Sequence, residues 1–163
     1  MKLNICCAER FVEGYVNVDI VPQHVPPGFN FQEVDLALSW PWPDNTFTEV
    51  LAYDAIEHLP DHIHTMNEAW RVLEPGGVFN IDVPTTDGRA AWQDPTHVSF
   101  WNRNSFWYYE AENVHRERFT ESYGIKAKFK VVREESRTGR EEVFGPNFTK
   151  LWILLEAVKE EKA

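Results

Sequence analysis

Three aspartates stand where a sheet of parallel strands would place its ligand. Asp19 closes one apolar run, Asp35 lies in a second, and Asp54 directly follows a third. In an open parallel sheet, ligands bind beyond the carboxyl ends of the strands. A carboxylate there can accept hydrogen bonds from ribose hydroxyls or from an adenine amino group. Each acid alone is better explained as a turn or cap residue, but three at successive strand ends indicate a nucleoside site.

Two histidines are the residues best suited to accept a proton, because imidazole titrates near neutral pH. His97 is the first candidate for a general base, and His58 is the second. Asp94 precedes His97 in the same segment, where its carboxylate could orient the imidazole. Structural explanations stay open for both histidines: His58 could pack or cap at a helix start, and His97 could be a loop residue bonded to Asp94.

A metal site is the weaker interpretation of the same region. Glu57, His58, His62 and His97 all carry side chains that can bind a metal ion. His58 and His62 have the i, i+4 spacing of a helical metal pair, but Pro60 lies between them and interrupts a continuous helix. We therefore predict no metal site. A metal-dependent hydrolase is the least favoured function of this chain.

The elements that must position these residues alternate between strands and helices. Apolar runs predict strands at residues 3–8, 14–20, 31–38, 47–53, 78–83, 128–135 and 150–158. Helical periodicity predicts helices over 60–73 and 104–123, the first ended by a left-handed glycine within 74–77. This order predicts one α/β domain, residues 1–163, with a doubly wound, Rossmann-like, mostly parallel sheet and an antiparallel C-terminal strand pair.

Composition excludes several classes of partner. The formal net charge is −10 and no run of Lys or Arg is visible, which argues against binding to a nucleic-acid backbone. No stretch approaches the roughly 18 apolar residues of a membrane span, and we recognise no signal peptide. Cys6 and Cys7 are adjacent, so in a strand they point to opposite faces and suit no structural disulfide. We expect a cytoplasmic protein without a nucleic-acid or membrane partner.

Several stretches of the chain resemble the class I S-adenosylmethionine-dependent methyltransferases. The runs WPWPDNTF at 40–47 and NEAWRVLEPGG at 67–77 are similar to segments that occur throughout this family. The start of the chain, LNI at 3–5 and GYVNVD at 14–19, resembles a subgroup of small, type 11-like members. The DPTH run at 94–97 is similar to a segment of the same subgroup.

The resemblance implies S-adenosylmethionine as the cofactor and assigns roles to particular residues. Asp19 would hold the ribose hydroxyls of this cofactor. Asp35 and Leu36 would flank the adenine, with the acid accepting from its amino group. Tyr53 and Asp54 would border the cofactor beyond the fourth strand. His58, with Ile56 and Glu57, would lie beneath or beside the methyl-transfer pocket, and Asp94 and His97 would face the substrate.

The first loop departs from the family's pattern. Asn4, Cys6 and Ala8 complete the set implied to contact the cofactor, but Cys6 and Ala8 stand where the resemblance expects glycine. Glycine there lets the backbone approach the cofactor closely. We expect Ala8 to be tolerated if its φ stays negative, whereas Cys6 requires a backbone shift.

The link between the first two predicted strands is also short, about six to eight residues where a parallel crossover normally needs a dozen or more. We expect one wall of the cofactor cleft to be open or to be supplied by the second subunit of a homodimer. The resulting prediction is methyl transfer from S-adenosylmethionine to a small-molecule or glycan-like acceptor. The alternative is a catalytically inactive, methyltransferase-like binding module with an altered cofactor loop.

Overall fold

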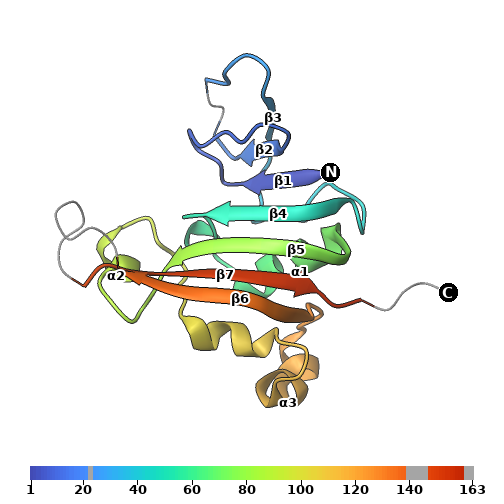
Figure 1. Ribbon diagram of the computed structural model, residues 1–163, viewed down its shortest axis with the longest axis vertical. Helices are drawn as coiled ribbons and strands as arrows, with labels where there is room; N and C mark the ends of the chain where they lie inside the picture. Colours follow the sequence, from blue (N-terminus) through green and yellow to red (C-terminus); the bar gives the residue numbers. More distant parts are fainter. Residues whose placement is uncertain (22–23, 139–146, 160–163) are drawn as a thin grey trace.

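A computed structural model shows one seven-stranded mixed sheet with helices packed against it (Figure 1). The structure describes residues 1–21, 24–138 and 147–159. The strands are β1 (Lys2–Ile5), β2 (Val16–Asp19), β3 (Asn30–Glu33), β4 (Phe47–Tyr53), β5 (Leu73–Pro84), β6 (Phe129–Thr138) and β7 (Thr149–Ala157). Their order is β3-β2-β1-β4-β5-β7-β6. This doubly wound order confirms the predicted fold class.

The directions of the strands determine where a site can form. Strands β1 to β5 run parallel, so their carboxyl ends meet at one edge of the sheet. Strand β7 is antiparallel to both β5 and β6, which confirms the predicted antiparallel pair. Because of this direction, β7 begins at the edge where the parallel strands end, and Lys150 lies opposite Pro84.

The first predicted helix is confirmed as α1 (His62–Val72), but its predicted ending is wrong. We expected a left-handed glycine to stop it. Instead Leu73 ends the helix in an extended conformation and begins β5, and Gly76, with a φ of 75°, lies inside that strand. Leu73 is fully buried and pairs with Phe47 of β4, so strand pairing determines where the helix stops.

The second predicted helix, over 104–123, is wrong as a single element. The structure has a 3₁₀ helix, η2 (Arg103–Tyr108), and a separate helix, α3 (Val114–Tyr123). Between them Glu110 forms an isolated bridge to Phe129. The Asn113 side chain then accepts a hydrogen bond from the His115 amide and begins the next helix. Two further short elements, η1 (Ile56–His58) and α2 (Ala90–Gln93), follow β4 and β5.

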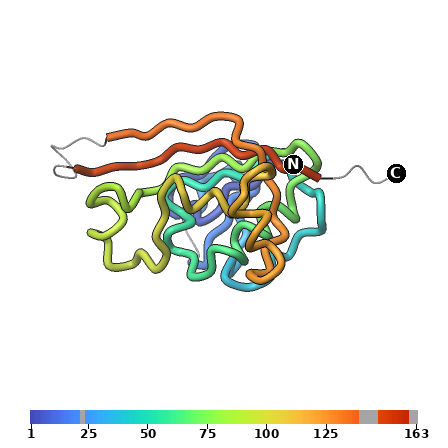
Figure 2. Tube along the Cα trace, turned by 90° about the horizontal axis from the view of Figure 1, so that it is seen from below, coloured from blue at the N-terminus to red at the C-terminus, as the bar shows by residue number. Residues whose placement is uncertain are grey.

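The described helical segments lie on one side of the sheet, below β6 and β7 in Figure 2. The core fills the space between them and the sheet, and its largest fully buried side chains include Trp101, Phe47 and Phe106. Residues 6–15, between β1 and β2, contain no helix, as the short link predicts. The homodimer stays a prediction. No helix among the described residues is long and apolar enough to cross a membrane.

The other face of the sheet carries polar and aromatic side chains that contact each other. Lys2 forms an ion pair with Glu49 at 3.1 Å. The Trp152 indole donates a hydrogen bond to Asn80, and the Arg133 guanidinium lies over the Trp152 ring. Alternation of apolar and polar residues along the strands therefore separates the core face from this one.

Candidate functional site

The loop after β1 adopts a backbone conformation that glycine favours, although it contains no glycine at the critical positions. Cys6 has a φ of 47° and Ala8 a φ of 43°. The condition under which we expected Ala8 to be tolerated, a negative φ, is therefore not met. The loop is fastened to β2, because the Cys7 amide donates to the Val18 carbonyl and the Ala8 amide donates to the Asp19 carboxylate at 2.9 Å.

A first cavity of about 430 Å³ opens beyond this loop, at the carboxyl edge of the parallel strands. Six of the eight residues predicted to bind a cofactor line it: Cys6, Ala8, Asp19, Asp35, Leu36 and Asp54. Apolar side chains such as Ile20, Val34 and Leu59 form the rest of the wall. The cavity thus combines an apolar surface with carboxylates at its rim.

The two remaining predicted residues, Asn4 and Tyr53, lie outside the lining of the first cavity. The Asn4 side chain is buried and donates to the Arg10 carbonyl and to the Asn17 side chain, so it holds the loop rather than a ligand. Tyr53 is 38% exposed. Because Ala52 faces the core, the alternation of the strand directs Tyr53 to the opposite face of the sheet.

A second cavity of about 340 Å³ adjoins the first. Asp54 and His58 line both cavities. The remaining lining residues are Arg10, Glu57, Pro84, Ala90, Gln93, Asp94, His97, Phe148 and Lys150. The three residues predicted to be catalytic, Asp94, His58 and His97, therefore all line this cavity.

Asp94 orients His58 rather than His97. The Asp94 carboxylate accepts hydrogen bonds from the Thr96 amide and from the Thr96 hydroxyl, at 2.8 and 2.6 Å, and these bonds lower the pKa of Asp94. The Thr96 hydroxyl has thereby used its only hydrogen. In its 3.2 Å contact with His58, the hydroxyl oxygen therefore accepts a hydrogen bond and Nδ1 of His58 donates it. A second contact, from Nδ1 to the Thr96 carbonyl, favours the same tautomer.

His97 faces a different acid, Glu57. Its Nδ1 lies 3.0 Å from the Ala91 carbonyl, an oxygen that can only accept, so Nδ1 carries the hydrogen and Nε2 carries a lone pair. That Nε2 lies 3.9 Å from a carboxylate oxygen of Glu57. Glu57 is 1% exposed, and burial raises its pKa to about 8.

Charged residues from distant segments pair with Asp54, which lines both cavities. Asp54 pairs with Arg10 at 3.0 Å and with Lys150 at 2.7 Å. Lys150 also pairs with Asp82 of β5. Burial alone would lower the pKa of Lys150, but its hydrogen bonds to Asp54 and Asp82 outweigh this effect and raise it.

Sequence reasoning missed two of these charged residues, Arg10 and Lys150. Arg10 carries no local signal, because its role depends on how the loop after β1 folds back toward β4. Lys150 could have been found from the strand order. The first residues of an antiparallel strand beside β5 must lie at the edge where β5 ends.

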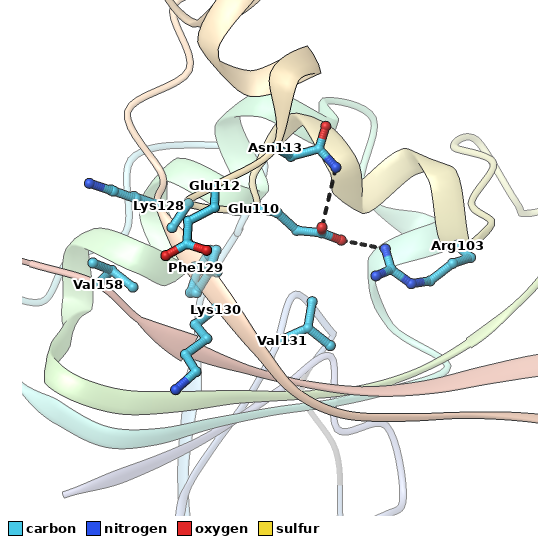
Figure 3. A pocket seen from close by; sticks show the side chains of 10 residues that line it. Arg103, Glu110, Glu112, Asn113, Lys128, Phe129, Lys130, Val131 and Val158 are labelled. Carbon is cyan, nitrogen blue, oxygen red and sulfur yellow. Dashed lines mark hydrogen bonds and ion pairs between the residues drawn. The ribbon is translucent and has the colours of Figure 1, made fainter.

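A third hollow, of about 400 Å³, lies at the opposite edge of the sheet, where β6 begins (Figure 3). Its carboxylate Glu110 is bonded to Arg103 and to Asn113, as the dashed lines in Figure 3 mark. Lys128 and Lys130 extend along its rim. Because it lies away from the strand ends and its central acid is paired, it is a weaker candidate than the other two cavities.

Comparison with known proteins identifies a related family in the first half of the chain. The sequence profile of a methyltransferase domain family matches residues 4–81, just under half of the chain. The 27-O-demethylrifamycin SV methyltransferase of Amycolatopsis mediterranei is 44% identical over 41 residues, which is 25% of this chain and 15% of that protein. This chain spans 24% or less of the length of the curated relatives that it matches.

Solved structures resemble the chain over nearly its full length. The cyclase SpnF superposes with a TM-score of 0.64 at 13% identity, covering 98% of this chain and 74% of SpnF. An S-adenosylmethionine-dependent methyltransferase from Methanosarcina mazei gives 0.61 at 16% identity, covering 98% of this chain and 92% of that one. At such low identity, the likeness establishes the fold alone.

Proposed function

We propose that this chain, which belongs to the class I S-adenosylmethionine-dependent methyltransferases, transfers a methyl group to a small-molecule or glycan-like acceptor. S-adenosylmethionine is the family's cofactor. One observation carries the proposal. Two cavities adjoin at the carboxyl edge of the parallel strands and share Asp54 and His58. A cofactor in the first and an acceptor in the second would meet across these two residues.

The first cavity fits the cofactor in size and in chemistry. Its volume of about 430 Å³ is within the range of small-molecule sites. Asp19 offers carboxylate oxygens to the ribose hydroxyls, and Asp35 offers one to the adenine amino group. Apolar side chains such as Leu36 would cover the faces of the base. The positive φ values of Cys6 and Ala8 keep the backbone in the conformation that lets the loop approach a ligand.

When bound, S-adenosylmethionine supplies an electrophilic methyl group carried on a sulfonium sulfur. The residues of the chain then have to hold the acceptor in line with that group, because alignment lowers the barrier to displacement. His58 and His97 present Nε2 lone pairs that can take a proton from the substrate that receives the methyl group. Asp94 is a positioning residue that acts on His58 through Thr96.

Two exposed aromatic rings favour an acceptor with a planar or sugar-like ring. Trp92 and Phe100 stack with centroids 4.6 Å apart on the segment that also carries Asp94 and His97. They are 61% and 40% exposed, so each offers a free surface to a ligand. Other rings of the same region, Trp101 and Phe106, are fully buried and belong to the core.

The experiment is calorimetric titration with S-adenosylhomocysteine of the wild type and of Asp19→Ala. We expect binding in the wild type and a loss of roughly 10- to 100-fold in the variant, since hydrogen bonds to a charged group contribute about 1.5–3 kcal/mol. Glu33→Ala is the matched control, because Glu33 ends the neighbouring strand β3, is exposed and lies outside the cavity lining.

Absence of heat in the wild type would contradict the proposal. Binding without methyl transfer to any member of an acceptor panel would instead favour the inactive binding module. The panel should include aromatic hydroxyl compounds and glycosides, because these match the exposed aromatic pair.

A further inference from the structure

We propose that Glu57, His58 and His97 form a binding site for a divalent metal ion, with zinc as the favoured ion. One ligand atom from each of these three side chains lies within 4.8 Å of the other two. Two imidazoles and one carboxylate are a donor set of catalytic zinc sites, which leave a fourth position open. The donors come from η1 and from the loop after α2, so tertiary structure brings them together.

The first supporting observation is a buried carboxylate without a partner. Both carboxylate oxygens of Glu57 lack a hydrogen bond within the part of the chain that the structure describes, and the residue is 1% exposed. Buried carboxylates are normally paired or coordinate a metal, because desolvation of an unpaired charge is costly. Its backbone carbonyl accepts from the amides of Val98 and Ser99, which fastens the loop of His97 to Glu57.

The second observation is the state of the two imidazoles. Nδ1 of His97 is bonded to the Ala91 carbonyl, and Nδ1 of His58 is bonded to the Thr96 carbonyl. Among the described residues, neither Nε2 has a hydrogen-bond partner. A backbone carbonyl on one ring nitrogen is the usual outer contact of a metal-binding histidine, because it fixes the ring and leaves the other lone pair to the ion.

The geometry needs only a small adjustment. Glu57 and His97 approach to 3.9 Å, which is too long for a hydrogen bond and slightly longer than the separation of two donors on a common ion. Donors bound tetrahedrally to zinc at about 2.0–2.2 Å lie about 3.3–3.6 Å apart. The three ligand atoms, which lie within 4.8 Å of one another, would therefore approach by at most about 1.5 Å. His58 is the most exposed of the three residues, so its ring can supply most of this movement.

The open position of such an ion would face the second cavity and would bind an oxygen or sulfur of the acceptor. The histidines would then act on the acceptor through the ion rather than by direct contact. This role rests on the proposed function, whereas binding of the ion does not. Lys150 and Arg10 are each paired with Asp54, so they leave the Glu57 carboxylate to the ion.

The test is titration of tag-free, metal-stripped protein with zinc, followed by calorimetry, with the visible spectrum of the cobalt-substituted protein as a second readout. We expect one ion per chain in the wild type. Glu57→Gln and His97→Ala should each lower the affinity by at least about 100-fold, more than loss of an outer contact costs. His24→Ala is the control, because His24 is exposed and lies in neither cavity.

Equal zinc affinity in all four proteins, or no binding by the wild type, would overturn the proposal. Circular dichroism and titration with S-adenosylhomocysteine show whether each variant is folded, and Glu57→Gln keeps the side-chain volume. The two proposals fail separately. S-adenosylhomocysteine bound without zinc affinity would exclude only the metal site, and zinc bound without nucleoside affinity would exclude only the proposed function.

Discussion

The two cavities lie side by side, yet their polar residues are held in different ways. In the first cavity the two acids that belong to it alone, Asp19 and Asp35, are bonded to backbone amides. The Asp35 carboxylate accepts from the Ala37 amide, and the Asp19 carboxylate accepts from the amides of Val21 and Ala8. In the second cavity the charged side chains hold one another across long stretches of sequence, as in the pair of Asp54 with Lys150.

This difference has energetic consequences. Residues with separate partners contribute nearly independently, so substitutions in the first cavity should change ligand affinity with little effect on folding. Residues in one network are coupled, so substitutions in the second cavity should change stability and activity together. Substitutions at Asp19 and Asp35 in the first cavity should therefore have independent effects on affinity, whereas substitutions in the second cavity should have coupled effects on stability and activity. Four substitutions or sets of substitutions test this distinction.

The largest effect is expected from Glu57→Met in metal-free protein. Replacing a buried, unpartnered carboxylate by an apolar side chain of similar size should raise the free energy of unfolding by about 1–4 kcal/mol. When zinc is added back, methyl transfer should be restored in the wild type but not in this variant. Chemical denaturation measures the first effect, and product formation measures the second.

Glu68→Met is the matched control for this prediction. The Glu68 carboxylate is bonded to Arg71 and to the Trp40 amide, and the bond to Arg71 lowers its pKa. Its replacement should therefore reduce stability, because it leaves those donors unpaired. If both substitutions change the free energy of unfolding in the same direction, the presence or absence of hydrogen-bond partners does not explain how Glu57 and Glu68 contribute to stability.

A pair of double-mutant cycles should give the next largest effect. Asp94→Ala and His58→Ala are linked through Thr96, so their effects on kcat/KM should be non-additive, with a coupling of about 0.5–3 kcal/mol. Asp19→Ala and Asp35→Ala share no partner, so their effects on the affinity for S-adenosylhomocysteine should add. Additive effects in the first cycle would remove the distinction between the cavities.

A smaller effect is expected from Asp35→Ala alone. It removes one hydrogen bond to the adenine amino group. The affinity for S-adenosylhomocysteine should fall about tenfold, because such a hydrogen bond contributes about 1–1.5 kcal/mol to binding. The melting temperature should change little, because the carboxylate makes its one described hydrogen bond to the Ala37 amide. Asp87→Ala, at an exposed position outside both cavities, should leave the affinity unchanged.

The smallest effect is expected from Cys6→Gly and Ala8→Gly. Both residues have a positive φ, which is unfavourable for side chains with a Cβ atom. Each substitution should raise the free energy of unfolding by about 0.5–1 kcal/mol after the greater chain entropy of glycine is subtracted. Cys7→Gly should do the opposite, because Cys7 is buried and has no positive φ. Thermal denaturation of the three variants tests this reversal of sign.

Much of the first cavity could be predicted because its signals are local. A strand, the acid at its end and the loop that follows lie close together in the sequence, as at Val18 and Asp19. Hydrophobic periodicity likewise predicts most strands and the helix α1. The family resemblance placed Asn4 and Tyr53 at the ligand as well, but a resemblance in sequence does not say which face of a strand a side chain occupies once the neighbouring strands pair.

The fold class, the sheet edge that carries the candidate site and six residues that line the first cavity could be predicted before the fold was known. The contacts of Glu57 with His97, of Asp94 with His58 through Thr96, and of Arg10 and Lys150 with Asp54 are visible only in the folded chain. The tertiary structure also divides residues 104–123 into two elements around the bridge of Glu110 to Phe129. The physical reason is that these contacts join residues distant in the chain, whose proximity depends on strand order and register rather than on local propensity.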